Sequence, residues 1–133
     1  MRTLLRFFVA VMMLVIVGCS GENSVLNSDG DQTNGTEFQV KYEVRFLSQG
    51  TVKISYKDNH SNVITADRVG SDWATEYTFR DRVDALLDVE ATDVDPTNQV
   101  TVQLAIFVNG NRVQQSTSII TYDKKSNISY SRP

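Results

Sequence analysis

Glu37-Phe38-Gln39-Val40-Lys41-Tyr42-Glu43-Val44-Arg45-Phe46 alternates apolar and polar side chains without interruption. Every second residue from Phe38 to Phe46 is apolar, whereas the residues between them are charged or carry an amide. Successive side chains of a β-strand point to opposite faces, so a period of two indicates a half-buried strand. The segment therefore predicts a strand with one face toward a core and the other toward water.

The same alternation recurs downstream in short segments that turn residues separate. Val100 to Val108 is the most apolar of them, which predicts a central position in its sheet. Asn109-Gly110 follows it and is a strong two-residue hairpin signal, because both residues tolerate a positive φ. Asp81 to Asp84 is predicted to be a polar corner. The other predicted strands are 51–57, 63–69, 73–80, 85–92 and 112–122, with a short edge strand at 127–131.

These segments predict an all-β domain, because no amphipathic helix of useful length is present among them. About seven short strands at regular spacing are typical of an immunoglobulin-like antiparallel β-sandwich. A small closed barrel is the alternative architecture. The sandwich domain is expected to span residues 37–133.

The first 18 residues contain a basic start, a short apolar run and a small residue at the end, and are expected to be a signal peptide. Arg2 and Arg6 precede an unbroken apolar run from Phe7 to Val17, and Gly18 is the small residue before Cys19. The run is shorter than the roughly 20 residues that cross a bilayer, so a cleaved secretory signal is the better interpretation. Ile16-Val17-Gly18-Cys19 resembles a lipobox, which implies cleavage before Cys19 and acylation of that residue. An ordinary signal peptide with an incidental cysteine is the alternative.

Residues 19–36 are predicted to be a lipid-anchored flexible linker. Ser, Asn, Gly and Asp dominate the segment, so it cannot bury enough apolar surface to offset the entropy of ordering. The whole chain carries 13 basic and 16 acidic residues, which gives no electrostatic basis for binding nucleic acid. It contains a single cysteine, so an intramolecular disulfide is excluded.

Four strand motifs stand out in the sequence: Val40-Lys41-Tyr42-Glu43-Val44, Gly50-Thr51-Val52-Lys53-Ile54-Ser55-Tyr56, Trp73, and Ile106-Phe107-Val108-Asn109-Gly110. Together they resemble the pattern of the MmpS (mycobacterial membrane protein small) family. The resemblance implies a small β-sandwich at the cell envelope that assists an RND-type export protein for lipids or siderophores. Asp72 stands where that family has proline, Leu104 stands where a cysteine is common, and the predicted anchor is a lipid rather than a membrane helix.

The predicted functional residues are few. Cys19 is the predicted lipid attachment site, and Trp73 and Tyr77 are candidates for lining a ligand groove, although aromatic residues on one strand face also fill cores. A lone loop histidine, His60, does not make a catalytic triad. The chain offers too few nitrogen and sulfur ligands for zinc, so we expect no catalytic residue, metal site or cofactor.

These observations favour a non-enzymatic, lipid-anchored envelope protein that binds or positions another component, such as an RND-type transporter. Its expected partners are the membrane, through an N-terminal lipid such as palmitate, and an envelope protein. The alternative is a carrier that holds a small apolar ligand between its sheets. Ser20 at the second position of the mature chain favours the outer membrane, with the domain in the periplasm or at the cell surface.

Overall fold

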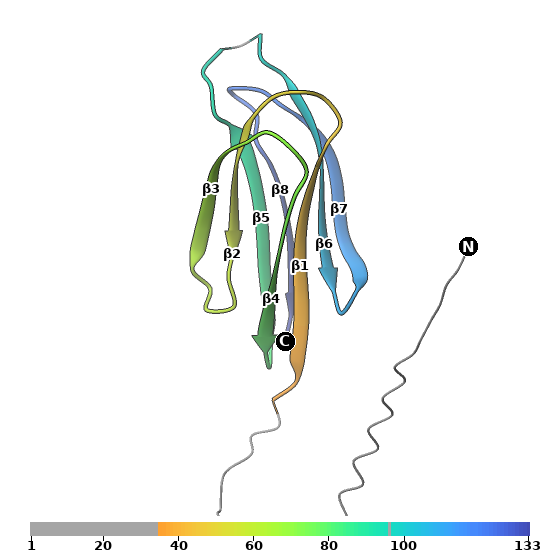
Figure 1. The fold of residues 1–133 in the computed structure, drawn as a ribbon. Coiled ribbons are helices and arrows are strands. Elements are labelled where there is room, and N and C mark those ends of the chain that lie inside the picture. The colour runs from red at the N-terminus through yellow and green to blue at the C-terminus, as the bar shows by residue number, and fades with distance from the viewer. Residues whose placement is uncertain (1–34, 96) are drawn as a thin grey trace, which may run out of the picture. The chain divides into compact units, whose positions relative to one another are not determined.

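The computed structural model describes residues 35–95 and 97–133, which form eight β-strands (Figure 1). The strands are β1 (Glu37–Phe46), β2 (Val52–Lys57), β3 (Val63–Val69), β4 (Trp73–Arg80), β5 (Val83–Ala91), β6 (Val100–Val108), β7 (Asn111–Ile120) and β8 (Ser126–Arg132). No helix is present in these two ranges, and none of their segments forms a helix able to span a membrane. The predicted all-β class is confirmed, with eight strands in place of about seven.

Two antiparallel four-stranded sheets make up the domain, in the orders β4-β1-β6-β7 and β3-β2-β5-β8. The chain crosses between sheets after β1, returns after β3, and crosses again after β4. This interlocks the neighbouring pair β1/β4 with the neighbouring pair β2/β5, as strands B/E and C/F interlock in an immunoglobulin-like sandwich. The strands therefore form a sandwich rather than a closed barrel.

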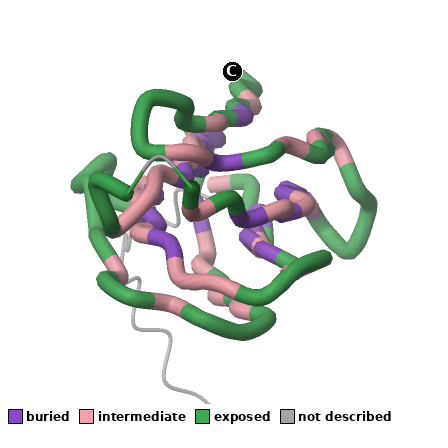
Figure 2. Tube along the Cα trace, turned by 90° about the horizontal axis from the view of Figure 1, so that it is seen from above, coloured by how far each residue is buried: buried purple, intermediate pink, exposed green. Residues whose placement is uncertain are grey.

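The core lies between the sheets and is built from the alternate inward positions of the strands. Viewed along the strands, the buried positions line the space between the two layers, whereas the connecting loops are exposed (Figure 2). The largest fully buried side chains are Tyr42, Ile54, Leu87, Leu104, Ile106 and Ile120. The alternating segment 37–46 is confirmed as a strand, with its apolar face in this core. β6 is central in its sheet, as its apolar composition predicts.

The prediction of a polar corner at residues 81–84 is wrong in its second half. β5 begins at Val83, which is only 2% exposed and pairs with Arg132 of β8. Val83 is in step with the inward residues Ala85 and Leu87, so the core extends to the first residue of the strand. Only two residues make the turn, and the first of them, Asp81, has a positive φ of 66°.

Two turns depend on glycine or asparagine. Asn109 and Gly110 have φ values of 50° and 78°, which confirms the predicted hairpin between β6 and β7. Gly50, between β1 and β2, has a φ of 143°, and a Cβ atom there would clash with Cγ2 of Val100. Because glycine has no Cβ atom, the loop can pack directly against β6.

Tyr42 links the two sheets by a hydrogen bond. Its hydroxyl, carried by β1, donates to the backbone oxygen of Lys57 at the end of β2 over 2.7 Å. The ring is fully buried, and this burial raises the pKa of the Tyr42 hydroxyl far above its usual value. The hydroxyl is therefore a permanent donor that satisfies the carbonyl oxygen at the edge of the core.

The predicted signal peptide, Cys19 and nearly all of the predicted linker lie outside the described residues. The described chain starts at Gly35 and reaches β1 two residues later. The predicted linker therefore joins the sandwich at the end that contains Glu37, which we call the proximal end. The opposite end, formed by the segments 47–51, 70–72, 92–95, 97–99 and 121–125, is the distal end (Figure 1).

Candidate functional site

Exposed apolar side chains gather at the distal end. Of the six large apolar residues that are exposed in the described chain, four lie in its loops or next to them. They are Leu47, Val94, Ile119 and Tyr122, with exposed fractions of 58, 88, 56 and 55%. We call these four residues the distal apolar group. Apolar side chains held in water at one end of a sandwich are a candidate contact surface for a partner.

Leu47 and Ile119 lie in one row across the outer face of the first sheet. The amide of Leu47 donates to the carbonyl oxygen of Thr101 over 2.9 Å, and Ile119 is paired with Thr101 on the other side. The amide of Thr101 donates to Oγ of Ser48 over 2.8 Å. These bonds fix the start of the β1–β2 loop against β6, so the Leu47 side chain is presented by an ordered backbone.

Val94 and Tyr122 are carried by loops that hydrogen-bond within themselves. Asp95 accepts bonds from the amide and the hydroxyl of Thr97 over 2.8 and 2.7 Å, which lowers the pKa of its carboxyl group. In the β7–β8 loop, the hydroxyl of Thr121 donates to Asp123 over 2.7 Å, which lowers the pKa of that carboxyl group too. Both carboxylates are therefore charged at neutral pH and hold the turns that expose Val94 and Tyr122.

Sequence reasoning missed the distal apolar group, although a local signal was present. Leu47 directly follows Phe46, and Ile119 directly precedes Ile120, so each breaks the alternation with a second apolar residue. Val94 stands alone between two aspartates in a loop. An apolar residue out of step with its strand, or alone in a turn, cannot face the core. Only the topology shows that these residues share one end.

Trp73 and Tyr77 lie on β4 as part of an aromatic cluster that joins the two sheets through side chains of β1, β2 and β4. The ring centroid of Tyr56, on β2, lies 5.1 Å from that of Trp73, 5.9 Å from that of Tyr77 and 5.6 Å from that of Tyr42. Burial, with the neighbouring Tyr77 hydroxyl at 3.5 Å, raises the pKa of Tyr56 to about 12. The structure thus brings both predicted residues together, half-buried and packed against the core.

A surface depression of about 290 Å³ lies beside Trp73, and three of its four other lining residues are charged. These four are Glu43, Arg45, Asp72 and Ala74, and Tyr77 is not among its lining residues. The Trp73 ring therefore has one side on the core cluster and an edge on a polar depression. The prediction that Trp73 and Tyr77 bind a ligand stays a prediction.

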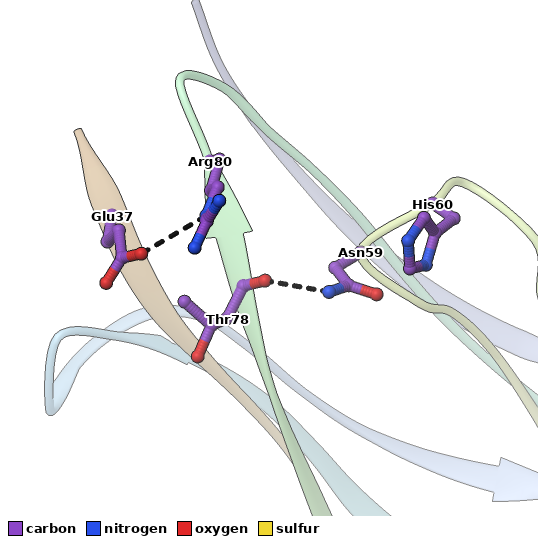
Figure 3. A pocket seen from close by; sticks show the side chains of 5 residues that line it. All are labelled: Glu37, Asn59, His60, Thr78 and Arg80. Atoms are coloured by element: carbon purple, nitrogen blue, oxygen red, sulfur yellow. Dashed lines mark hydrogen bonds and ion pairs between the residues drawn. The ribbon is translucent and has the colours of Figure 1, made fainter. Parts of the chain in front are cut away.

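A larger polar groove, of about 540 Å³, lies at the proximal end (Figure 3). Its walls come from β1, β4 and the β2–β3 turn. Nε of Arg80 contacts Oε1 of Glu37 at 3.2 Å, and Nδ2 of Asn59 donates to the carbonyl oxygen of Thr78 over 3.0 Å. His60 lines the groove beside Asn59, and its imidazole makes no hydrogen bond to another described residue. The charges of the groove are already paired, so it presents no concentrated field to a ligand.

Asp58 holds the β2–β3 turn, which contributes Asn59 and His60 to this groove. Its Oδ1 accepts the amides of His60 and Asn62, each over 2.8 Å, and its Oδ2 accepts Nδ2 of Asn62 over 3.1 Å. Burial opposes the charge on Asp58, but these hydrogen bonds outweigh it and lower the pKa of the carboxyl group. The folded chain therefore binds a proton at Asp58 less readily than the unfolded chain does.

We expect the Asp58→Asn variant to flatten the acid limb of the stability curve. A lowered pKa in the folded state means that the carboxylate stabilises the fold above its unfolded pKa, and this contribution is lost as the pH falls below about 4. Urea unfolding of both chains between pH 6 and pH 2.5 measures the difference. Equal losses of stability on acidification in the two chains would contradict the assignment to Asp58.

The solvent-facing sides of β1 and β2 point in opposite directions, because the two strands belong to different sheets. On the outer face of the second sheet, charged residues form ion pairs between strands, such as Lys57 with Asp84 at 2.8 Å.

No group of three or more histidine, cysteine, aspartate or glutamate residues with metal-binding geometry occurs among residues 35–95 and 97–133. No protein-family model and no curated protein matches this chain.

Proposed function

We propose that this chain is a lipid-anchored, non-enzymatic module of a bacterial cell envelope that contacts another envelope protein through its distal apolar group. The lipid on Cys19 tethers the domain to the membrane, with the outer membrane favoured, and the sandwich stands in the periplasm or at the cell surface. The RND-type transporter that the MmpS resemblance implies is the proposed partner.

The position of the distal apolar group is the observation that carries the proposal. All four side chains lie at the end of the sandwich away from Glu37, the first residue of β1. A strand of 10 residues, such as β1, spans roughly 33 Å, so a tether at the proximal end leaves the distal end free to meet a partner. Fully burying a large apolar side chain contributes about 1.5–3 kcal/mol, so burial of these side chains would stabilise a complex with a partner.

Photocrosslinking in intact cells tests the contact. A photoreactive benzoylphenylalanine at position 94 or 122 is expected to give one discrete high-mass adduct whose second component is an envelope membrane protein. The control is the same amino acid at position 63, because Val63 is 59% exposed but lies at the proximal end of β3. Adducts of equal yield from all three positions, or none from either distal position, would count against the proposal.

Charge at the distal end should weaken the contact without unfolding the domain. We expect Leu47→Glu combined with Val94→Glu to reduce adduct yield from position 122 about tenfold, since an unpaired carboxylate would be buried at the contact. Both side chains are mostly in water in the free domain, so the unfolding midpoint should stay nearly unchanged. Val63→Glu, at a site of matched exposure, should leave the yield as in the wild type.

A further inference from the structure

β7 is the longest edge strand of the described domain and is almost without charge. It has 10 residues and pairs only with β6, so the backbone groups along its outer side have no strand partner. Its one charged residue, Arg112, is at its start, and Gln114 to Ser118 are amides and hydroxyls. Natural edge strands are usually protected from pairing with other chains by charge, proline or a bulge. The stretch 114–118 has none of these protections, and the register shift of the β6–β7 pair lies before it.

The two edge strands on the other side of the sandwich are protected. β3 carries Asp67 and Arg68, has a register shift against β2, and bends at Arg68, whose φ is 54°. β4 carries Glu76 near its middle and Arg80 at its end. Pairing β4 with a second copy about its middle would bring the two Glu76 carboxylates close together, which is unfavourable. The contrast between the two sides indicates that only one of them is suited to strand pairing.

The edge of β8 lies beside that of β7 and carries a charged residue only at its end, Arg132. Oγ of Ser118 on β7 is 2.7 Å from Oγ of Ser126 on β8, so the two edges run together on one side of the sandwich. Ser126 to Ser131 contain no charged residue. A partner that pairs with β7 therefore lies close to a second edge, from the other sheet, that is uncharged over Ser126 to Ser131.

We propose that two copies of this chain pair antiparallel along β7, about a two-fold axis near Ser116. An antiparallel pair is the arrangement in which one edge can meet itself with the same contacts on both sides. Gln115 of one copy then lies opposite Thr117 of the other, and both can form hydrogen bonds across the pair. The two Arg112 side chains stay roughly 27 Å apart, at eight residue steps, so no like charges meet.

The pairing has a consequence for the anchor. Antiparallel strands place the proximal ends of the two copies at opposite ends of the dimer, and their distal apolar groups also face opposite ways. Two lipid anchors on one dimer would hold it side-on to the membrane and direct the two distal ends along the surface. The inference does not depend on the proposed partner, because it rests on β7 and β8 alone.

Disulfide trapping of the full chain tests the pairing. In an antiparallel pair, opposite Cα atoms are about 4.5–5.5 Å apart, which a disulfide can bridge. We expect Ser116→Cys to give a covalent dimer under mild oxidation, seen at twice the monomer mass without reductant. Gln114→Cys alone should give little, because its copies are roughly 13 Å apart, but should link to a co-expressed Ser118→Cys chain.

The wild-type chain, which keeps Cys19, sets the background of the assay, and Thr65→Cys on β3 is the matched control. No dimer above background from any position between 114 and 118, or equal dimer from Thr65→Cys, overturns the proposal. As a second readout, Gln115→Lys combined with Thr117→Lys places lysines opposite lysines. This variant should abolish a dimer formed by the detergent-extracted wild type, and a dimer that persists would also overturn the proposal.

Discussion

Replacing Leu104 with alanine is expected to lower the free energy of unfolding by about 2–5 kcal/mol. Leu104 is fully buried in the middle of β6, between the neighbouring strands β1 and β7. Alanine would leave a cavity between two sheets whose backbones are fixed by hydrogen bonds on both sides, so the site cannot collapse to fill it. Domains of this size are stable by only about 5–15 kcal/mol, so the loss is a large share of the total. Urea unfolding followed by tryptophan fluorescence measures it, because Trp73 packs on the core.

Leu47→Ala is the matched control for this change, with the same chemistry at a side chain that is 58% exposed. It should change the free energy of unfolding by no more than about 0.5 kcal/mol. A loss at Leu104 no larger than that at Leu47 would mean that the space between the sheets is not close-packed. It would also favour the alternative function, a carrier with room for an apolar ligand in the core.

The strands could be predicted from the sequence because their signal is local. The apolar positions of 37–46 and 100–108 alternate with polar ones, and a side chain's face in a strand depends only on its parity. The turn at Asn109-Gly110 was equally readable, since few residues adopt two successive positive φ values. The start of β5 was missed because Val83 stands between the charged residues Arg82 and Asp84. A single apolar residue in a charged segment does not by itself indicate a strand.

The arrangement of the strands could not be read in the same way. The loop 47–51 can close a hairpin or carry the chain to the other sheet, and its composition suits both. The structure shows that β2 crosses to the second sheet, which places Lys41 and Lys53 on opposite outer faces. Pairing between strands far apart in sequence, such as β1 with β6, depends on the whole core and leaves no local mark.

The candidate site was only partly predictable for the same reason. Trp73 and Tyr77 are four residues apart on one strand. Because this spacing is even, the alternation of side chains alone places both on the same face of the sheet. Their contact with Tyr56 needed the topology, as did the grouping of Leu47 with Ile119 through Thr101. The prediction of a lipid on Cys19 rests on residues before the described domain and needs its own test.

Replacing Cys19 with alanine is expected to abolish the incorporation of labelled palmitate and to remove the protein from the outer-membrane fraction. The sulfur of Cys19 is the only thiol in the chain, so no other cysteine can take its place. Each buried CH₂ group contributes about 0.8 kcal/mol to membrane binding, and two or more acyl chains give a stable anchor whereas one gives a marginal one. The effect should therefore be nearly complete rather than graded.

Ser20→Ala is the control, because it alters the neighbouring residue and leaves the Cys19 sulfur in place. It should take up palmitate as the wild type does. The domain of the Cys19→Ala variant should unfold at the same urea concentration as the wild type, since the core of the described residues begins at Phe38, well after position 19. Loss of anchoring with an intact domain would separate the tether from the fold. Palmitate missing from the wild type, or a Cys19→Ala chain that stays with the outer membrane, would show that something other than this lipid holds the protein there.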